Sequence, residues 1–62
     1  MDLINIVQSE ALKVSGKVIS GEVAENILMT HTAYPYHSHL RWDEIGLRTW
    51  LNKQFLSKDI KL

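Results

Sequence analysis

Three histidines lie close together near the middle of the chain, at His31, His37 and His39. Neutral imidazoles are common zinc ligands, and Asp43 or Glu44 could add a carboxylate. The spacing matches no closed zinc site, however. We therefore interpret the cluster as a polar loop before a helix and expect no metal or other cofactor. A pH-sensing role for the same imidazoles is the alternative.

No side chain has the setting of an enzymatic nucleophile. The chain has no cysteine, and none of its serines lies in a Gly-x-Ser-x-Gly sequence. The adjacent carboxylates Asp43 and Glu44 would diverge by about 100° on a helix, so they do not form a facing acid–base pair. The glycines at Gly16, Gly21 and Gly46 are too scattered for a phosphate-binding loop. Because 62 residues rarely enclose a water-excluding site, we expect a protein that binds and does not catalyse.

Aromatic side chains give the clearest indication of binding. Tyr34 and Tyr36 flank the only proline, Pro35, which restricts its own backbone and that of the residue before it. Tyrosine, tryptophan and arginine are the residue types enriched at binding hot spots. We therefore predict a small regulatory or inhibitory protein that docks on another protein. The predicted docking surface comprises Tyr34, Tyr36, Arg41, Trp42, Ile45 and Leu56.

Nucleic-acid binding is the alternative function. Arg41, Arg48 and Asn52 would share one side of a helix, where they could contact DNA bases or phosphates. The net charge of zero argues against it, since nucleic-acid binders usually have a basic excess. The long connection between residues 30 and 38 also fits a helix-turn-helix poorly. A DNA-binding regulator of transcription or recombination is therefore the second choice.

Length and composition limit the architecture. With 62 residues, 45% of them hydrophobic and 23% charged, the chain is expected to form one domain over residues 1–62. Its apolar runs are too short to span a membrane, and its first 20 residues do not resemble a signal peptide. Together with the lack of cysteine, this predicts a soluble cytoplasmic protein with no membrane partner.

Apolar residues recur at helical spacing in three segments, which predicts an all-α, compact three-helix domain. The predicted helices cover residues 2–15, 21–30 and 39–57. Suitable N-caps precede their first turns at Asp2, Ser20 and Ser38. Gly16 suits the end of the first helix because glycine readily adopts the left-handed conformation. The alternative is an α+β fold in which residues 12–19 form a short hairpin.

Each predicted helix has an apolar stripe that is suited to the core. The stripes are Ile4, Val7, Ala11 and Val14; Val23, Ala24, Ile27, Leu28 and His31; and Leu40, Leu47, Trp50, Leu51 and Phe55. The third helix has a second apolar side, formed by Trp42, Ile45 and Leu56. Because a monomer needs only one stripe, the second side predicts either that this helix is packed centrally between other elements or that it meets a partner. A structural homodimer or larger homo-oligomer is a further alternative.

Overall fold

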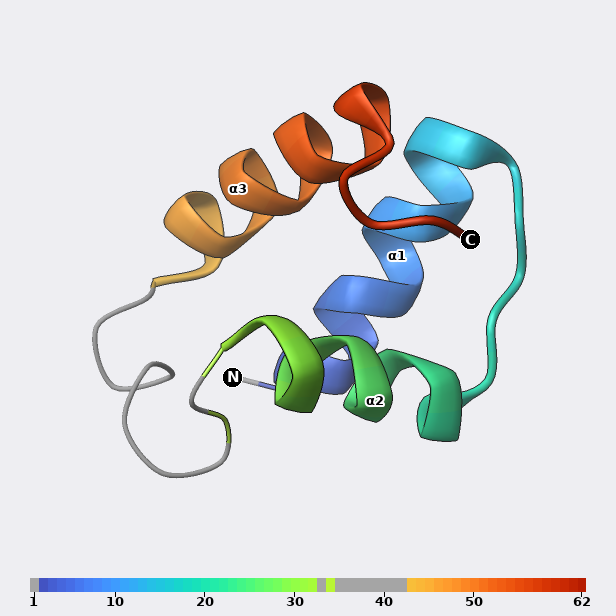
Figure 1. Ribbon diagram of the computed structural model, residues 1–62. Helices are drawn as coiled ribbons and strands as arrows, with labels where there is room; N and C mark the ends of the chain where they lie inside the picture. The colour runs from blue at the N-terminus through green and yellow to red at the C-terminus, as the bar shows by residue number, and fades with distance from the viewer. Residues whose placement is uncertain (1, 33, 35–42) are drawn as a thin grey trace.

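A computed structural model describes residues 2–32, 34 and 43–62. It contains three helices in the order α1 (Leu3–Ser15), α2 (Gly21–His31) and α3 (Glu44–Ser57) (Figure 1). The described residues contain no strand, so the all-α three-helix prediction is confirmed and the hairpin over residues 12–19 is wrong. None of the helices in these segments has both the length and the apolar composition needed to cross a bilayer.

Side-chain caps and a glycine set the ends of α1. The Asp2 carboxylate accepts hydrogen bonds from the backbone N–H groups of Ile4 and Asn5, at 3.1 and 3.3 Å. At the other end, Gly16 has φ 69°, and its N–H donates to the carbonyl of Leu12 at 2.9 Å. Residues 12–15 are therefore helical up to this left-handed stop, whereas the hairpin alternative required a strand before the turn.

The linker between α1 and α2 is fixed by hydrogen bonds at the end that leads into α2. Gln8 on α1 donates a hydrogen bond from its side-chain amide to the carbonyl of Ile19, at 3.1 Å. Ser20 then caps α2, since its hydroxyl oxygen accepts from the Val23 N–H at 3.1 Å. The predicted cap at Ser20 is therefore confirmed.

The start of α3 differs from the prediction. Asp43 has an extended backbone (φ −81°, ψ 174°), and its carboxylate accepts from the Gly46 N–H at 2.7 Å. Asp43 is thus the N-cap of α3 rather than a residue of its first turns, and the predicted start at residue 39 is wrong. The predicted cap, Ser38, lies outside the described residues. Periodicity does not fix the first residue of a helix, which the cap geometry decides.

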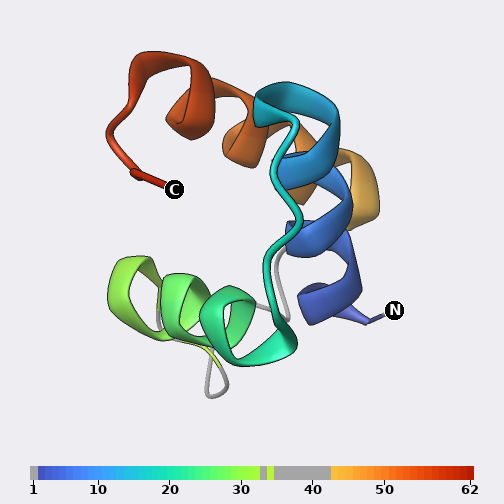
Figure 2. The same ribbon diagram turned by 90° about the vertical axis from the view of Figure 1, so that its right-hand side faces the viewer.

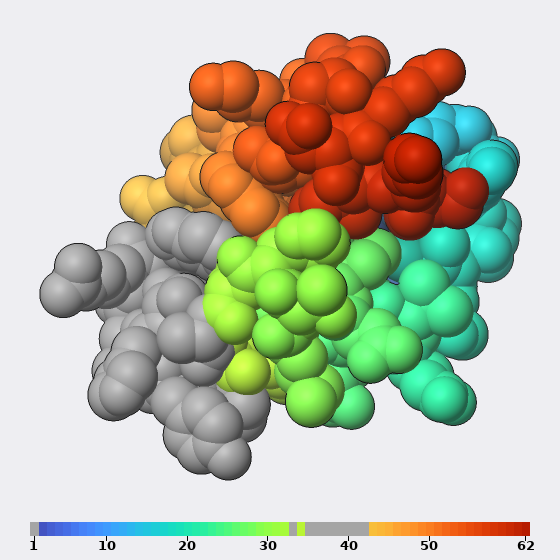
Figure 3. Space-filling model, in the orientation of Figure 1, coloured from blue at the N-terminus to red at the C-terminus, as the bar shows by residue number. Residues whose placement is uncertain are grey.

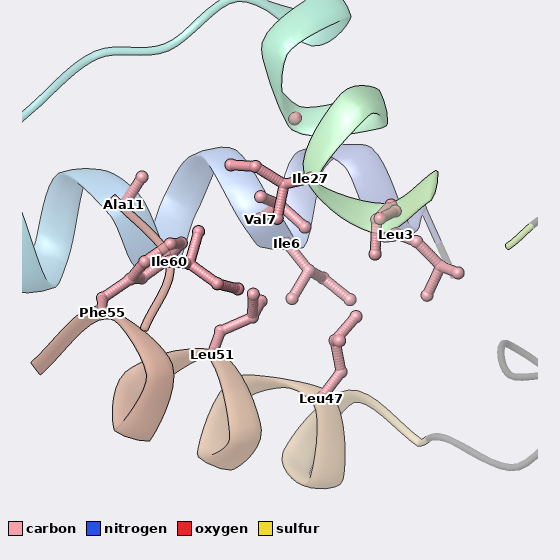
Figure 4. Close-up of a cluster of buried hydrophobic side chains, with 11 residues drawn as sticks. Leu3, Ile6, Val7, Ala11, Ile27, Leu47, Leu51, Phe55 and Ile60 are labelled. Atoms are coloured by element: carbon pink, nitrogen blue, oxygen red, sulfur yellow. The ribbon is translucent and has the colours of Figure 1, made fainter. Parts of the chain in front are cut away.

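The core lies on α1, against which both α2 and α3 pack (Figure 2). Leu47, Leu51 and Phe55 point from α3 toward α1, and Ile27 approaches from α2 (Figure 4). The buried apolar residues are Leu3, Ile6, Val7, Ala11, Ala24, Ile27, Leu28, Leu47, Leu51, Phe55 and Ile60. One continuous cluster therefore joins all three helices.

The predicted core stripes were right in their centres and wrong at their edges. On α1, Leu3 and Ile6 are buried, whereas the predicted Ile4 and Val14 are only partly buried. On α2, the predicted Val23 and His31 are exposed. The reason is that α1 is covered on two sides, so its buried arc is wider than one stripe. In contrast, α2 packs mainly against α1, so its buried arc is narrower.

The residues after α3 fold back and complete the core. Figures 1 and 2 together show this C-terminal segment turning back from the end of α3 toward the side on which α2 lies. Lys58 turns the chain with φ 63°, and Ile60 is then only 3% exposed. The Lys17 ammonium donates to the backbone carbonyl of Leu62 at 2.9 Å, which ties the segment to the linker. The sequence pattern did not predict this role for Ile60, because a lone apolar residue has no periodicity.

Candidate docking surface

The side of α3 that faces away from the core carries two exposed apolar side chains among polar ones. Ile45 is 76% exposed and Leu56 is 66% exposed. They are three helical turns apart and therefore lie on one side of α3, with Thr49 between them. The Thr49 hydroxyl donates to the Ile45 carbonyl at 2.8 Å, which leaves its methyl group to the surface. We call Ile45, Thr49 and Leu56 the outer face of α3.

The structure places three of the six predicted docking residues. Ile45 and Leu56 lie together on the outer face of α3, as predicted from their spacing. Tyr34 is half-buried and packs against the core, and its backbone N–H donates to the Thr32 hydroxyl at 3.0 Å. The other three predicted residues, Tyr36, Arg41 and Trp42, lie outside the described residues. Trp50, predicted to close the core, is half-buried against it.

The guanidinium of Arg48 is held by three side chains of the protein itself. It donates to the carboxylates of Glu44 and Glu10, at 2.8 and 2.9 Å, and to the hydroxyl of Ser9, at 3.1 Å. The hydrogen bond to Glu44, followed by that to Glu10, raises the pKa of Arg48, so the group stays charged at neutral pH. Of the residues suggested for DNA contact, Asn52 is half-buried and Arg41 lies outside the described residues.

Glu10 is the buried charge that the sequence analysis missed. It is 1% exposed on the inner side of α1, and its carboxylate pairs with Arg48 across the α1–α3 interface. A buried carboxylate is stable only when it is paired. Its position three residues after Val7 and next to Ala11 places it within the core stripe, and this spacing was the available signal.

A groove opens where the C-terminal ends of α1 and α3 come together. Its volume is about 530 Å³, and it is open to solvent. Its apolar walls are Val14, Phe55, Leu56, Ile60 and Leu62, and the lysines that line it are Lys17, Lys58 and Lys61. We call it the lysine groove. Figure 3 shows the red C-terminal residues that form one wall, lying against the cyan end of α1.

The predicted histidine cluster is represented by one residue in the structure. His31 ends α2 and is exposed, whereas His37 and His39 lie outside the described residues. Within the described segments no three histidine or carboxylate side chains lie close enough to hold a metal ion.

No protein-family model matches this chain, and no curated protein or solved structure is significantly similar to it. The outer face of α3 and the lysine groove are therefore the features from which a function can be argued. Leu56 belongs to both, so the two surfaces are continuous.

Proposed function

We propose that this chain is a small regulatory or inhibitory protein that binds another protein through the outer face of α3. The observation that carries the proposal is the exposure of Ile45 and Leu56 on a helix whose opposite side already supplies the core. A helix on the surface of a monomer needs a single apolar stripe. A second apolar side that is exposed is typical of a binding surface.

The mode of action would be steric, because the outer face of α3 offers two exposed apolar side chains and a threonine whose hydroxyl is already bonded to the backbone. Large apolar side chains on a rigid helix bind a partner by filling its pockets while the surrounding polar residues exclude water. The short bond between Thr49 and the Ile45 carbonyl supports this mode, since it removes a hydroxyl from the surface that must be desolvated.

The test is the effect of Ile45→Ser on partner binding. The protein and its variant would be immobilised and used to capture partners from extracts of the source cells. We expect Ile45→Ser to melt like the parent and to bind the captured partner at least about tenfold more weakly, as for a hot-spot residue. The matched control is Val18→Ser, which replaces an apolar side chain that is 86% exposed but lies in the α1–α2 linker. Equal capture by all three proteins would contradict the proposal.

The two alternative functions use residues near the same helix and are separated by simple measurements. A homo-oligomer formed through the outer face of α3 would change its mass in solution with concentration, and Ile45→Ser would return it to a monomer. DNA binding would weaken steeply with added salt. The structure gives the DNA alternative less support, because Arg48 is already bonded to Glu10 and Glu44.

A further inference from the structure

We infer that the lysine groove binds an acidic, amphipathic segment of the partner protein. The inference rests on the proposed function, in which the chain acts by binding protein, and it adds the chemistry of the partner. Two independent features of the groove carry it: apolar walls that continue from the outer face of α3, and a concentration of lysines in a chain with no net charge.

The apolar walls provide the affinity. Leu56 contributes to the groove and to the outer face of α3, and it is 66% exposed. A helical segment lying along Ile45 and Leu56 would therefore reach the groove at the end of α3. Phe55 and Ile60 form the bottom of the groove from the edge of the core, so its shape is fixed by buried residues. A volume of about 530 Å³ is in the range of sites that enclose small ligands or a few side chains.

The lysines provide the selectivity for acidic residues. The chain has seven basic and seven acidic residues, yet Lys17, Lys58 and Lys61 all line this one groove. The described residues that line it include no aspartate or glutamate. The C-terminal ends of α1 and α3 contribute about half a negative charge each. Three ammonium groups exceed these two partial charges, so carboxylates of a partner are attracted.

A protein segment fits the groove better than an anionic lipid. The groove is open to solvent along one side, whereas an acyl chain is stabilised by an enclosed apolar cavity. An open groove next to an exposed helix face instead matches the way in which amphipathic helices are bound, with apolar anchors inside and charges at the rim.

The test uses a fluorescein-labelled helical peptide with leucine on one face and glutamate on the other. We expect saturable binding to the folded protein, measured by fluorescence anisotropy. Lys61→Glu should weaken it about tenfold, because a rim charge is reversed. The matched control is Lys13→Glu, which makes the same change at an exposed lysine of α1 that lines neither the groove nor the outer face of α3. We expect the control to bind within about twofold of the parent.

Several outcomes would overturn the inference. Absence of saturable binding would do so, and so would equal weakening by Lys13→Glu and Lys61→Glu, since the attraction would then be non-specific. A peptide with glutamine in place of glutamate should bind more weakly than the acidic peptide, and equal binding would remove the role of the lysines. Sedimentation with vesicles of phosphatidylcholine and phosphatidylglycerol that depends on Lys61, without peptide binding, would assign the groove to lipid.

The failure of this inference is distinguishable from failure of the proposed function. Ile45 does not line the groove, so Ile45→Ser should leave peptide binding by the groove measurable. If the peptide does not bind but Ile45→Ser still abolishes partner capture, the outer face of α3 keeps its role and only the groove is wrongly assigned. If the peptide binds through Lys61 while Ile45→Ser leaves partner capture unchanged, the groove stands and the outer face of α3 has no role.

Discussion

The two sides of α3 are built from similar residues and have opposite surroundings. Leu47 and Leu51 are fully buried against α1, whereas Leu56, only five residues after Leu51, is 66% exposed. Leucine is equally hydrophobic at all three positions, so residue type does not decide burial here. What decides it is the angle around the helix axis relative to α1. The buried side of α3 therefore forms part of the core. The requirements of folding do not account for the apolar residues on its exposed side.

The boundary between the two sides is an ion pair. Arg48 lies at the edge of α3 beside α1, where it reaches the buried carboxylate of Glu10. A bonded, directional contact of this kind fixes the rotation of α3 about its own axis, because a small rotation would separate the two groups. Apolar contacts alone would fix the rotation less sharply, since apolar residues also occur on the outer face of α3.

The largest expected effect is a loss of stability on substitution at the buried side of α3. Leu51→Ala should lower the free energy of unfolding by about 2–5 kcal/mol, because it removes buried methyl groups and leaves a cavity. Leu56→Ala is the matched control, and we expect it to change stability by no more than about 0.5 kcal/mol because Leu56 is exposed. Urea unfolding followed by circular dichroism measures both. Equal effects of the two substitutions would refute the division of α3 into a buried and an exposed side.

An intermediate effect is expected at the boundary. Arg48→Ala should lower the melting temperature by several degrees, because the Glu10 carboxylate then remains buried without its partner. The pKa of Arg48 is raised above an already high value, so the guanidinium keeps its charge throughout the neutral range and loses it only in strong alkali. The decrease in melting temperature caused by Arg48→Ala should therefore be the same throughout the neutral pH range.

The double variant Glu10→Ala with Arg48→Ala sharpens this test. Removing both partners leaves no unpaired charge, so the double variant should melt above Arg48→Ala alone. If it instead melts well below the single variant, the two residues stabilise the fold independently, and the ion pair does not orient α3.

The smallest expected effect concerns where α3 begins. Asp43→Ala should cost about 1 kcal/mol, because it removes the carboxylate that caps the Gly46 N–H. The sign of the change is diagnostic. If the helix began at residue 39, Asp43 would lie inside it, and alanine would stabilise the protein through its higher helix propensity. Thermal melting of this one variant therefore distinguishes the two starting points.

The sequence predicted the three helices and most of their ends. It predicted the contacts between distant parts of the chain less well. Short-range signals such as Asp2, Ser20 and Gly16 act within a few residues, so the ends of α1 and the start of α2 were correctly placed. At the start of α3 only Ser38 was predicted as the cap, whereas Asp43 has that role in the structure. The exposure of Ile45 and Leu56 followed from their angular position.

Features that depend on distant parts of the chain were not predicted. The pair of Glu10 and Arg48 joins residues 38 positions apart, and no local pattern links them. The burial of Ile60 requires the chain to turn at Lys58, a residue that rarely adopts a positive φ. The lysine groove could not be predicted either, because its walls come from two helices and the segment after α3.

The shared use of α1 also has a consequence for the order of folding. Contacts between α1 and the start of α2 close a short loop, as in the bond between Gln8 and Ile19, which are 11 residues apart. Contacts with α3 close a much longer one, such as the 38-residue separation between Glu10 and Arg48. The longer closure costs roughly 1 kcal/mol more in chain entropy. We therefore expect folding to begin with the pairing of α1 and α2, and α3 to pack against that pair last.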